Sequence, residues 1–314
     1  MHKTGVSLAD PEVCACAASG GHLHVLRWAR EHGCPWDAMT CARAARGGHL
    51  DVLRWAREHG CPWDAYTCDA AAENGHLETL RWARENDCDW NEETCKYAAA
   101  GGHLEILQWA RAEGCPWEVA VCVEVAAAGG HLSQGGATPP GAKVLAGRHL
   151  EVLRWLLTEQ NAPLTGIATD NAARFGQLEI LKWLKTGLPL FEFHDFSPAA
   201  AFGGHIEVLQ WLKAEGFSGW SSRACRCAAE GGQLEALKWL RANGCPWDFR
   251  TLHGAVRNRS VTIVRWARES GCGWDTVTRD KAAAELGYTD KFGHEFCLPD
   301  PPEVPPPAEE EEAV

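Results

Sequence analysis

The amino-acid sequence predicts an all-α fold, a solenoid of about nine helix-turn-helix repeats followed by one capping helix. Three observations lead to this fold class: a fixed period, a recurring pair of helix signals, and helices too short to be stable alone. The period is 27 or 28 residues, apart from one gap of 46. It is marked by Trp28, Trp55, Trp82, Trp109, Trp155, Trp183, Trp211, Trp239 and Trp266. A constant period of this length indicates stacked units that share one elongated core.

The unit over 37–63 shows how each repeat is built. Asp37 is a suitable N-cap for a helix over 38–46. Gly47 and Gly48 end that helix, because glycine adopts the left-handed turn at low cost. A second helix is expected from about 49 to 59. Since helices of about ten residues are marginal in water, stacking between repeats must stabilise them.

The chain divides into a leader, a repeat array and a tail. We expect the leader over 1–9, the array over 10–290 with a capping helix near its end, and a disordered, acidic Pro/Glu-rich tail over 291–314. The gap of 46 residues comes from an inserted segment in repeat five, 133–148, whose glycines and prolines favour a surface loop. A mis-spliced segment of the gene is the alternative explanation for this insertion.

Composition and charge exclude several function classes. The formal net charge is −12, and six acidic residues after Leu298 leave about −6 on the repeats. Neither part offers the basic patch that phosphate binding needs, so nucleic acid is not an expected ligand. No apolar stretch of about 20 residues is present, so no membrane-spanning helix is expected. The start lacks the apolar core of a secretory signal, so we expect an intracellular protein, cytoplasmic or nuclear.

The 15 cysteines are interpreted as reduced, structural thiols. Equivalent cysteines of neighbouring repeats, such as Cys34 and Cys61, should lie about 8–10 Å apart, too far for a disulfide. A Cys or His that recurs in each repeat performs the same packing role each time. The alternative is a metal-binding or enzymatic protein that uses this series, with Cys41 and His49 as nucleophile and base. We predict no catalytic residue, no cofactor and no metal ion.

The repeated sequence resembles the ankyrin repeat. The pattern Thr-x-x-x-Ala-Ala-x-x-Gly-His-Leu-Glu-Val-Leu is matched best over 40–53, 67–80, 94–107 and 199–209. The resemblance covers about residues 9–290 and implies protein partners bound on the concave side by first helices and loops. Two features depart from the family: the period is shorter than its usual 33 residues, and the Thr-Pro-Leu-His signature is absent. We therefore expect the β-hairpin finger of the family to be trimmed to a short loop.

Two tryptophans recur in each regular repeat. We expect the one in the second helix, for example Trp82, to lie in the core. The one in Cys-Pro-Trp, for example Trp63, is expected to fill the space beneath the trimmed loop. The alternative for this second row is a partly exposed stripe that binds a partner, since tryptophan is favoured in interface hot spots.

Comparison of repeats two to four identifies candidate partner-binding residues. Positions that pack the solenoid must recur, whereas positions that contact a partner are free to vary. The variable first-helix positions hold both tyrosines of these repeats, a residue type favoured at interfaces. The candidates are Met39, Arg43, Arg46, Tyr66, Asp69, Glu73, Glu93, Lys96 and Tyr97. We predict a non-catalytic protein-interaction scaffold, monomeric on its own; the further alternative is a substrate adaptor in a larger complex.

Overall fold

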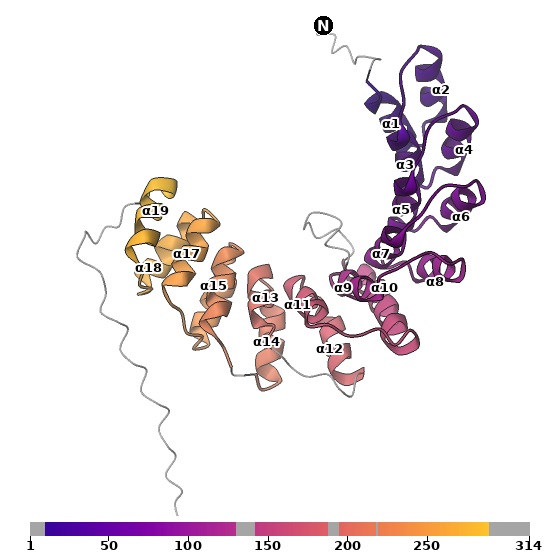
Figure 1. Ribbon diagram of the computed structural model, residues 1–314. Coiled ribbons are helices and arrows are strands. Elements are labelled where there is room, and N and C mark those ends of the chain that lie inside the picture. Colours follow the sequence, from indigo (N-terminus) through magenta and orange to yellow (C-terminus); the bar gives the residue numbers. More distant parts are fainter. Residues whose placement is uncertain (1–9, 130–141, 188–194, 218, 289–314) are drawn as a thin grey trace, which may run out of the picture. The chain divides into compact units, whose positions relative to one another are not determined.

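Pairs of short helices make up the parts of the chain that the structure describes, which are residues 10–129, 142–187, 195–217 and 219–288 of a computed structural model (Figure 1). No strand occurs within these ranges. The nine helix pairs and one further helix confirm the predicted fold class. Contacts within the chain define two units, 1–196 and 197–314, which are taken in turn. The expected leader and acidic tail lie outside the described residues.

The first unit contains six helix pairs. Their bounds are α1 Glu12–Ser19, α2 Leu23–Glu31, α3 Ala38–Arg46, α4 Leu50–Glu58, α5 Ala65–Glu73, α6 Leu77–Glu85, α7 Glu92–Ala100, α8 Leu104–Ala112, α9 Val119–Ala127, α10 Ala142–Arg154 with the π-helix η1 Trp155–Glu159, α11 Gly166–Arg174 and α12 Leu178–Gly187. The odd-numbered helices from α1 to α9, with α11, stack one on the next, and each second helix packs against its own first helix. The small residues of the first helices allow this close approach, and Ala44, Ala71 and Ala98 are at most 1% exposed.

The second unit repeats the arrangement. Its helices are α13 Ser197–Gly203, α14 Ile206–Ala214, α15 Ser222–Glu230, α16 Leu234–Ala242, α17 Phe249–Arg257, α18 Val261–Glu269 and α19 Thr276–Leu286. The first helices α13, α15 and α17 stack in order, and α19 closes the stack against α17. Thr278 and Ala282 are the buried residues of α19. Its polar outer face is that of the predicted capping helix.

Local signals set the ends of the helices. The Asp37 carboxylate accepts a hydrogen bond from the backbone N–H of Met39 at 3.0 Å, as predicted for an N-cap. Gly48 has φ +69°, and a Cβ there would lie 2.5 Å from Nδ1 of His76. Glycine is therefore needed both for the backbone conformation and for the close approach of the next repeat.

The histidines of Gly-His-Leu in repeats two to four join each of these repeats to the preceding one. The Nε2 atom of each contacts a backbone carbonyl near the end of the previous first helix: His49 contacts Ser19 at 3.1 Å, and His76 contacts Arg46 at 3.0 Å. These contacts satisfy carbonyls that a helix C-terminus leaves without an intrahelical partner. The recurring histidine therefore has a structural role.

Several second-helix tryptophans differ from the expectation that they are core residues, although Trp155 is buried as expected. Trp55, Trp82 and Trp109 are half-buried, and Trp28 is 49% exposed. The cause is the wider spacing of the second helices, which contact one another less than the first helices do. The rings of Trp55, Trp82 and Trp109 each lie beside an arginine of the preceding second helix, namely Arg27, Arg54 and Arg81.

Repeat five also differs in part from its prediction. Helix α10 begins at Ala142, so the last seven residues of the expected loop, 142–148, are helical. The remainder of that expected loop, 133–141, lies outside the described residues. The helix then continues as η1, whose wider turns accommodate extra backbone.

Candidate functional site: a pocket on the stacked first helices

Five of the nine candidate residues line one pocket. Arg46 lies at the end of α3, Tyr66 and Glu73 at the two ends of α5, and Lys96 and Tyr97 in the middle of α7. Stacking of α3, α5 and α7 brings these side chains together, although they span 52 positions of the sequence. The pocket has a volume of about 230 Å³. Its remaining lining is apolar, from Ala100 and Val125.

Ion pairs hold the charged side chains of the pocket in place. Nη2 of Arg46 lies 2.9 Å from Oε2 of Glu73, and the hydrogen bond between them raises the pKa of Arg46. Nζ of Lys96 lies 2.7 Å from Oε2 of Glu93, a candidate residue outside the pocket lining, and this bond raises the pKa of Lys96. The pocket rim is thus built of fixed cations beside carboxylates.

Tyr97 adds an aromatic wall to the pocket. Its ring centroid lies 5.6 Å from Nζ of Lys96, within cation–π range. Burial raises the pKa of the Tyr97 hydroxyl, and a tyrosine hydroxyl is already protonated at neutral pH at its ordinary pKa of about 10. It can therefore donate a hydrogen bond to a bound group. Tyr66, on the neighbouring helix, is 36% exposed.

Asp69 lies beneath the surface, which differs from the expectation that it faces a partner. It is 6% exposed, and its carboxylate accepts a hydrogen bond from Oγ1 of Thr94 at 2.6 Å. Burial raises its pKa to about 6. Asp69 therefore joins α5 to α7 below the pocket and does not line it.

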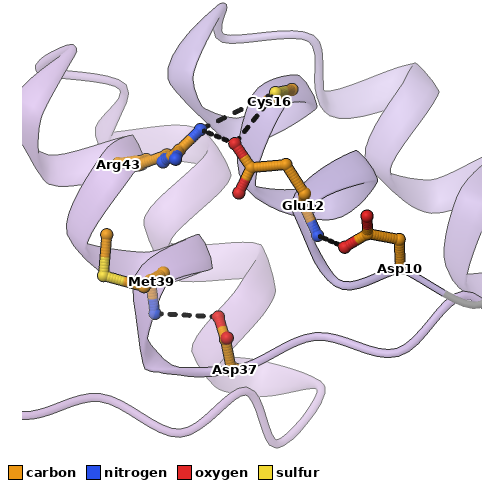
Figure 2. A network of polar contacts seen from close by, with 6 residues as sticks. All are labelled: Asp10, Glu12, Cys16, Asp37, Met39 and Arg43. Atoms are coloured by element: carbon orange, nitrogen blue, oxygen red, sulfur yellow. Dashed lines mark hydrogen bonds and ion pairs between the residues drawn. The ribbon is translucent and has the colours of Figure 1, made fainter.

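Met39 and Arg43 lie apart from the pocket, at the interface of α3 with α1 (Figure 2). Nη1 of Arg43 is 2.7 Å from Oε1 of Glu12 and 3.6 Å from Sγ of Cys16. Met39 is 39% exposed. Glu12 and Cys16 also line a recess of about 400 Å³ between α1 and α2. The candidate residues therefore form two groups, and the larger group is at the pocket.

Sequence comparison missed the apolar lining of the pocket. Ala100 occupies the same repeat position as Arg46 and Glu73. The variation of this position between repeats was therefore a signal that could have identified Ala100 as a pocket residue. Val125 replaces the alanine that packs the core in earlier repeats, such as Ala98, and it is 5% exposed. Nothing in the sequence distinguishes this residue from a core residue.

Cys41 and His49 each contact other groups in the structure. Nε2 of His49 contacts the Ser19 carbonyl, and the Cys41 thiol is hydrogen bonded to Cys61, so Cys41 and His49 do not form a nucleophile–base pair. Among the described residues, no group of three or more His, Cys, Asp or Glu side chains could hold a metal ion. A search of the same residues finds no helix long and apolar enough to cross a membrane.

Stacked helix pairs with a pocket on their first helices define a helical-repeat protein, and one family model matches a part of the chain. Residues 68–111, which run from α5 to α8, match the family model described as ankyrin repeats in many copies. The same helix pair recurs through both units. Over residues 68–111 the chain is similar to ankyrin repeats. No curated protein matches it.

Solved structures of another helical-repeat protein show a distant likeness. Two crystal structures of the pentatricopeptide repeat protein PPR10 in complex with an 18-nt psaJ RNA element match at 12% identity and a TM-score of 0.32, over 91% of this chain and 54% of theirs. A structure of PPR10 from maize matches at 11% identity and a TM-score of 0.29, over 87% of this chain and 51% of that one. The chain thus spans about half the length of these proteins.

Proposed function

We propose that this helical-repeat protein is a non-catalytic scaffold that binds a protein partner on its stacked first helices, around the pocket of Arg46, Tyr66, Lys96 and Tyr97. The observation that carries the proposal is the convergence of variable residues. Side chains selected because they differ between repeats meet in one pocket once the helices stack. Residues whose only role is packing have no physical reason both to vary between repeats and to lie together in one pocket.

The size of the pocket favours a partner side chain over a cofactor. Small-molecule sites commonly occupy about 300–1,000 Å³, and the pocket is smaller, at about 230 Å³. Interface hot spots are pockets of this kind, in which one large side chain of the partner is fully desolvated. Ala100 and Val125 provide the apolar surface for such an anchor.

The rim of the pocket favours a partner that presents hydrogen-bond acceptors around its anchor. The guanidinium of Arg46 has five N–H donors and the ammonium of Lys96 has three. Each is paired with one carboxylate, that of Glu73 or Glu93, so N–H donors remain for a partner. The Tyr97 hydroxyl is a further donor. A peptide segment with an apolar anchor and neighbouring carbonyl or carboxylate groups matches this rim.

Affinity capture with a pocket variant tests the proposal. The full chain, the double variant Tyr66→Ala/Tyr97→Ala and the control Phe249→Ala are used as bait, and captured proteins are quantified by mass spectrometry. Phe249 is a matched control because it is 42% exposed at the start of α17, a first helix of the other unit.

We expect at least one protein to be captured equally by the wild type and the control and to fall about tenfold or more with the double variant, the effect of losing a hot spot. Circular dichroism must show the same helix content for all three baits. Equal capture of every partner by the double variant would place binding elsewhere on the chain.

A further inference from the structure

Ten of the twelve buried cysteines among the described residues lie in pairs within single repeats. One member is in the first helix and the other follows the second helix, 20 positions later. The five pairs are Cys14 with Cys34, Cys41 with Cys61, Cys68 with Cys88, Cys95 with Cys115, and Cys225 with Cys245. All ten thiols are buried and reduced in the structure. These contacts are within one repeat, unlike the pairs of equivalent cysteines considered from the sequence.

Each pair forms a short hydrogen-bonded chain. Sγ of Cys225 donates to Sγ of Cys245 at 3.3 Å, and Sγ of Cys245 donates to the carbonyl of Ser221 at 3.3 Å. Repeat two has the same arrangement, because Cys41 is hydrogen bonded to Cys61, and Sγ of Cys61 donates to the Asp37 carbonyl at 3.4 Å. The sulfur atoms of Cys225 and Cys245 are therefore in direct contact.

Packing does not require a thiol at either position. In the last repeat Leu252 occupies the first-helix position opposite Cys272 and is fully buried. In repeat five Ala162 occupies the loop position, and its N–H bonds to the Leu156 carbonyl as that of Cys61 bonds to Ala56. Aliphatic residues thus serve at both positions, whereas the five complete pairs place two thiols together.

We infer that these pairs are reversible dithiol–disulfide sites, which an oxidant of the peroxide class converts into disulfides within single repeats. The thiolate of the loop cysteine attacks one peroxide oxygen, and the O–O bond breaks to give a sulfenic acid and, after protonation, water. The first-helix thiol loses its proton and attacks the sulfenic sulfur, so that the S–S bond forms and a second water leaves. Two thiols are oxidised, and one peroxide is reduced to two waters.

The surroundings of the pair assign the attacking thiol. The hydrogen bond from Cys41 and the nearby Arg57 guanidinium lower the pKa of Cys61, and Cys95 and Arg111 lower that of Cys115 in the same way. The same hydrogen bond, with burial, raises the pKa of Cys41. In these two repeats the loop member is therefore the more acidic thiol, and the thiolate is the reactive form. Local opening of a repeat admits the oxidant to it.

Disulfide formation needs a small movement and adds a constraint. The sulfur atoms of Cys225 and Cys245 must approach from 3.3 Å to the bonding distance of about 2.05 Å. The bond ties a first helix to the loop after its second helix. Closing this loop removes freedom from the unfolded chain, so the oxidised protein should be more stable to heat.

The test treats the full, folded chain with hydrogen peroxide, blocks remaining thiols with N-ethylmaleimide in denaturant, and maps disulfides by mass spectrometry without reduction. We expect cross-links between the paired positions, loss of these links with dithiothreitol, and a higher melting temperature of the oxidised form. Cys122 and Cys272, each without a paired cysteine, should be recovered alkylated.

Two variants make the result specific to the pairs. Cys225→Ala/Cys245→Ala should lose the cross-link of that repeat alone, and Leu252→Cys should create a new one with Cys272. The inference is wrong if links join different repeats, if they form only in denaturant, or if no link forms while Cys16, an exposed thiol, is oxidised.

Discussion

The guanidinium carbon of Arg57 lies 4.1 Å from the centroid of the Trp63 ring, and the same guanidinium donates a hydrogen bond to the carbonyl of Cys61. One side chain thus fixes the end of α4 and covers the indole of the following loop. The arrangement recurs in Arg30 with Trp36, Arg84 with Trp90, Arg111 with Trp117, Arg241 with Trp247, and Arg268 with Trp274. It explains why the pattern Arg-x-x-x-Cys-x-Trp is repeated in the sequence.

Replacing this arginine should destabilise the protein more than replacing the neighbouring one. Arg57→Ala removes a charge-assisted hydrogen bond and a close cation–π contact, so we expect a loss of about 2 kcal/mol in the free energy of unfolding. Arg54→Ala is the control, since the exposed Arg54 lies 5.6 Å from the Trp82 ring, and it should lose less than about 1 kcal/mol. Urea denaturation measures both; equal losses would contradict the role given to Arg57.

The two tryptophan rows should be energetically coupled. The ring centroids of Trp63 and Trp82 are 5.9 Å apart in an edge-to-face arrangement, and both rings are half-buried. We expect each alanine substitution to lose about 2–3 kcal/mol, below the range for fully buried tryptophan. The double variant should lose about 0.5–1.5 kcal/mol less than the sum. Trp63→Ala with Trp109→Ala, one repeat further away, is the control and should be additive; a coupled control or an additive test pair would refute this account.

Asp69 should make stability depend on pH in the acidic range. Burial raises its pKa from 3.8 to about 6, so the folded state binds the proton more tightly than the unfolded state. The contribution of Asp69 therefore becomes less favourable as pH rises from about 4 to 6, and the loss persists above pH 6. Asp69→Asn keeps an acceptor for Thr94 without the charge, so it should stabilise the protein by about 1 kcal/mol at pH 7 and little at pH 4.

Chemical denaturation between pH 4 and 8 tests this behaviour of Asp69. Asp89→Asn, which removes an exposed carboxylate after α6, is the control and should change stability little at any of these values. A stability difference between Asp69→Asn and the wild type that is the same at pH 4 and pH 7 would contradict the raised pKa.

His103 should make the protein less stable as pH falls, which is the opposite of the pH dependence expected from Asp69. Burial lowers its pKa from 6.5 to about 4, and its Nε2 contacts the Glu73 carbonyl at 3.1 Å. Because the unfolded chain takes up the proton first, its contribution is lost as pH falls from about 6.5 to 4. His103→Gln should lose less stability over this range, since glutamine occupies the equivalent position at Gln233. The exposed His59→Gln serves as control; an unchanged acid slope in His103→Gln would show that other groups cause it.

Features set by adjacent residues could be predicted from the sequence. The helix over 38–46 begins and ends where expected, because capping by Asp37 is a local interaction. The variable first-helix positions likewise gave five residues of the pocket, because stacking at a constant period keeps equivalent positions aligned.

Features that depend on spacing between helices could not be predicted. The exposure of Trp28 and the half-burial of Trp82 follow from the gap between second helices, which no single repeat encodes. Asp69 varies between repeats like a surface residue, yet Thr94 of the next repeat covers it. The contact between Cys225 and Cys245 arises when the chain folds back over 20 residues.

Site-specific photo-cross-linking tests the central claim, that a protein partner binds at the pocket of the first helices. Benzoylphenylalanine is placed at position 97, in the pocket wall, or at position 249, the exposed first-helix site of the other unit, and each chain is irradiated with the partner found by capture. We predict covalent adducts from position 97 and little or none from position 249. Adducts from position 249 alone, with undiminished binding by both chains, would contradict the claim.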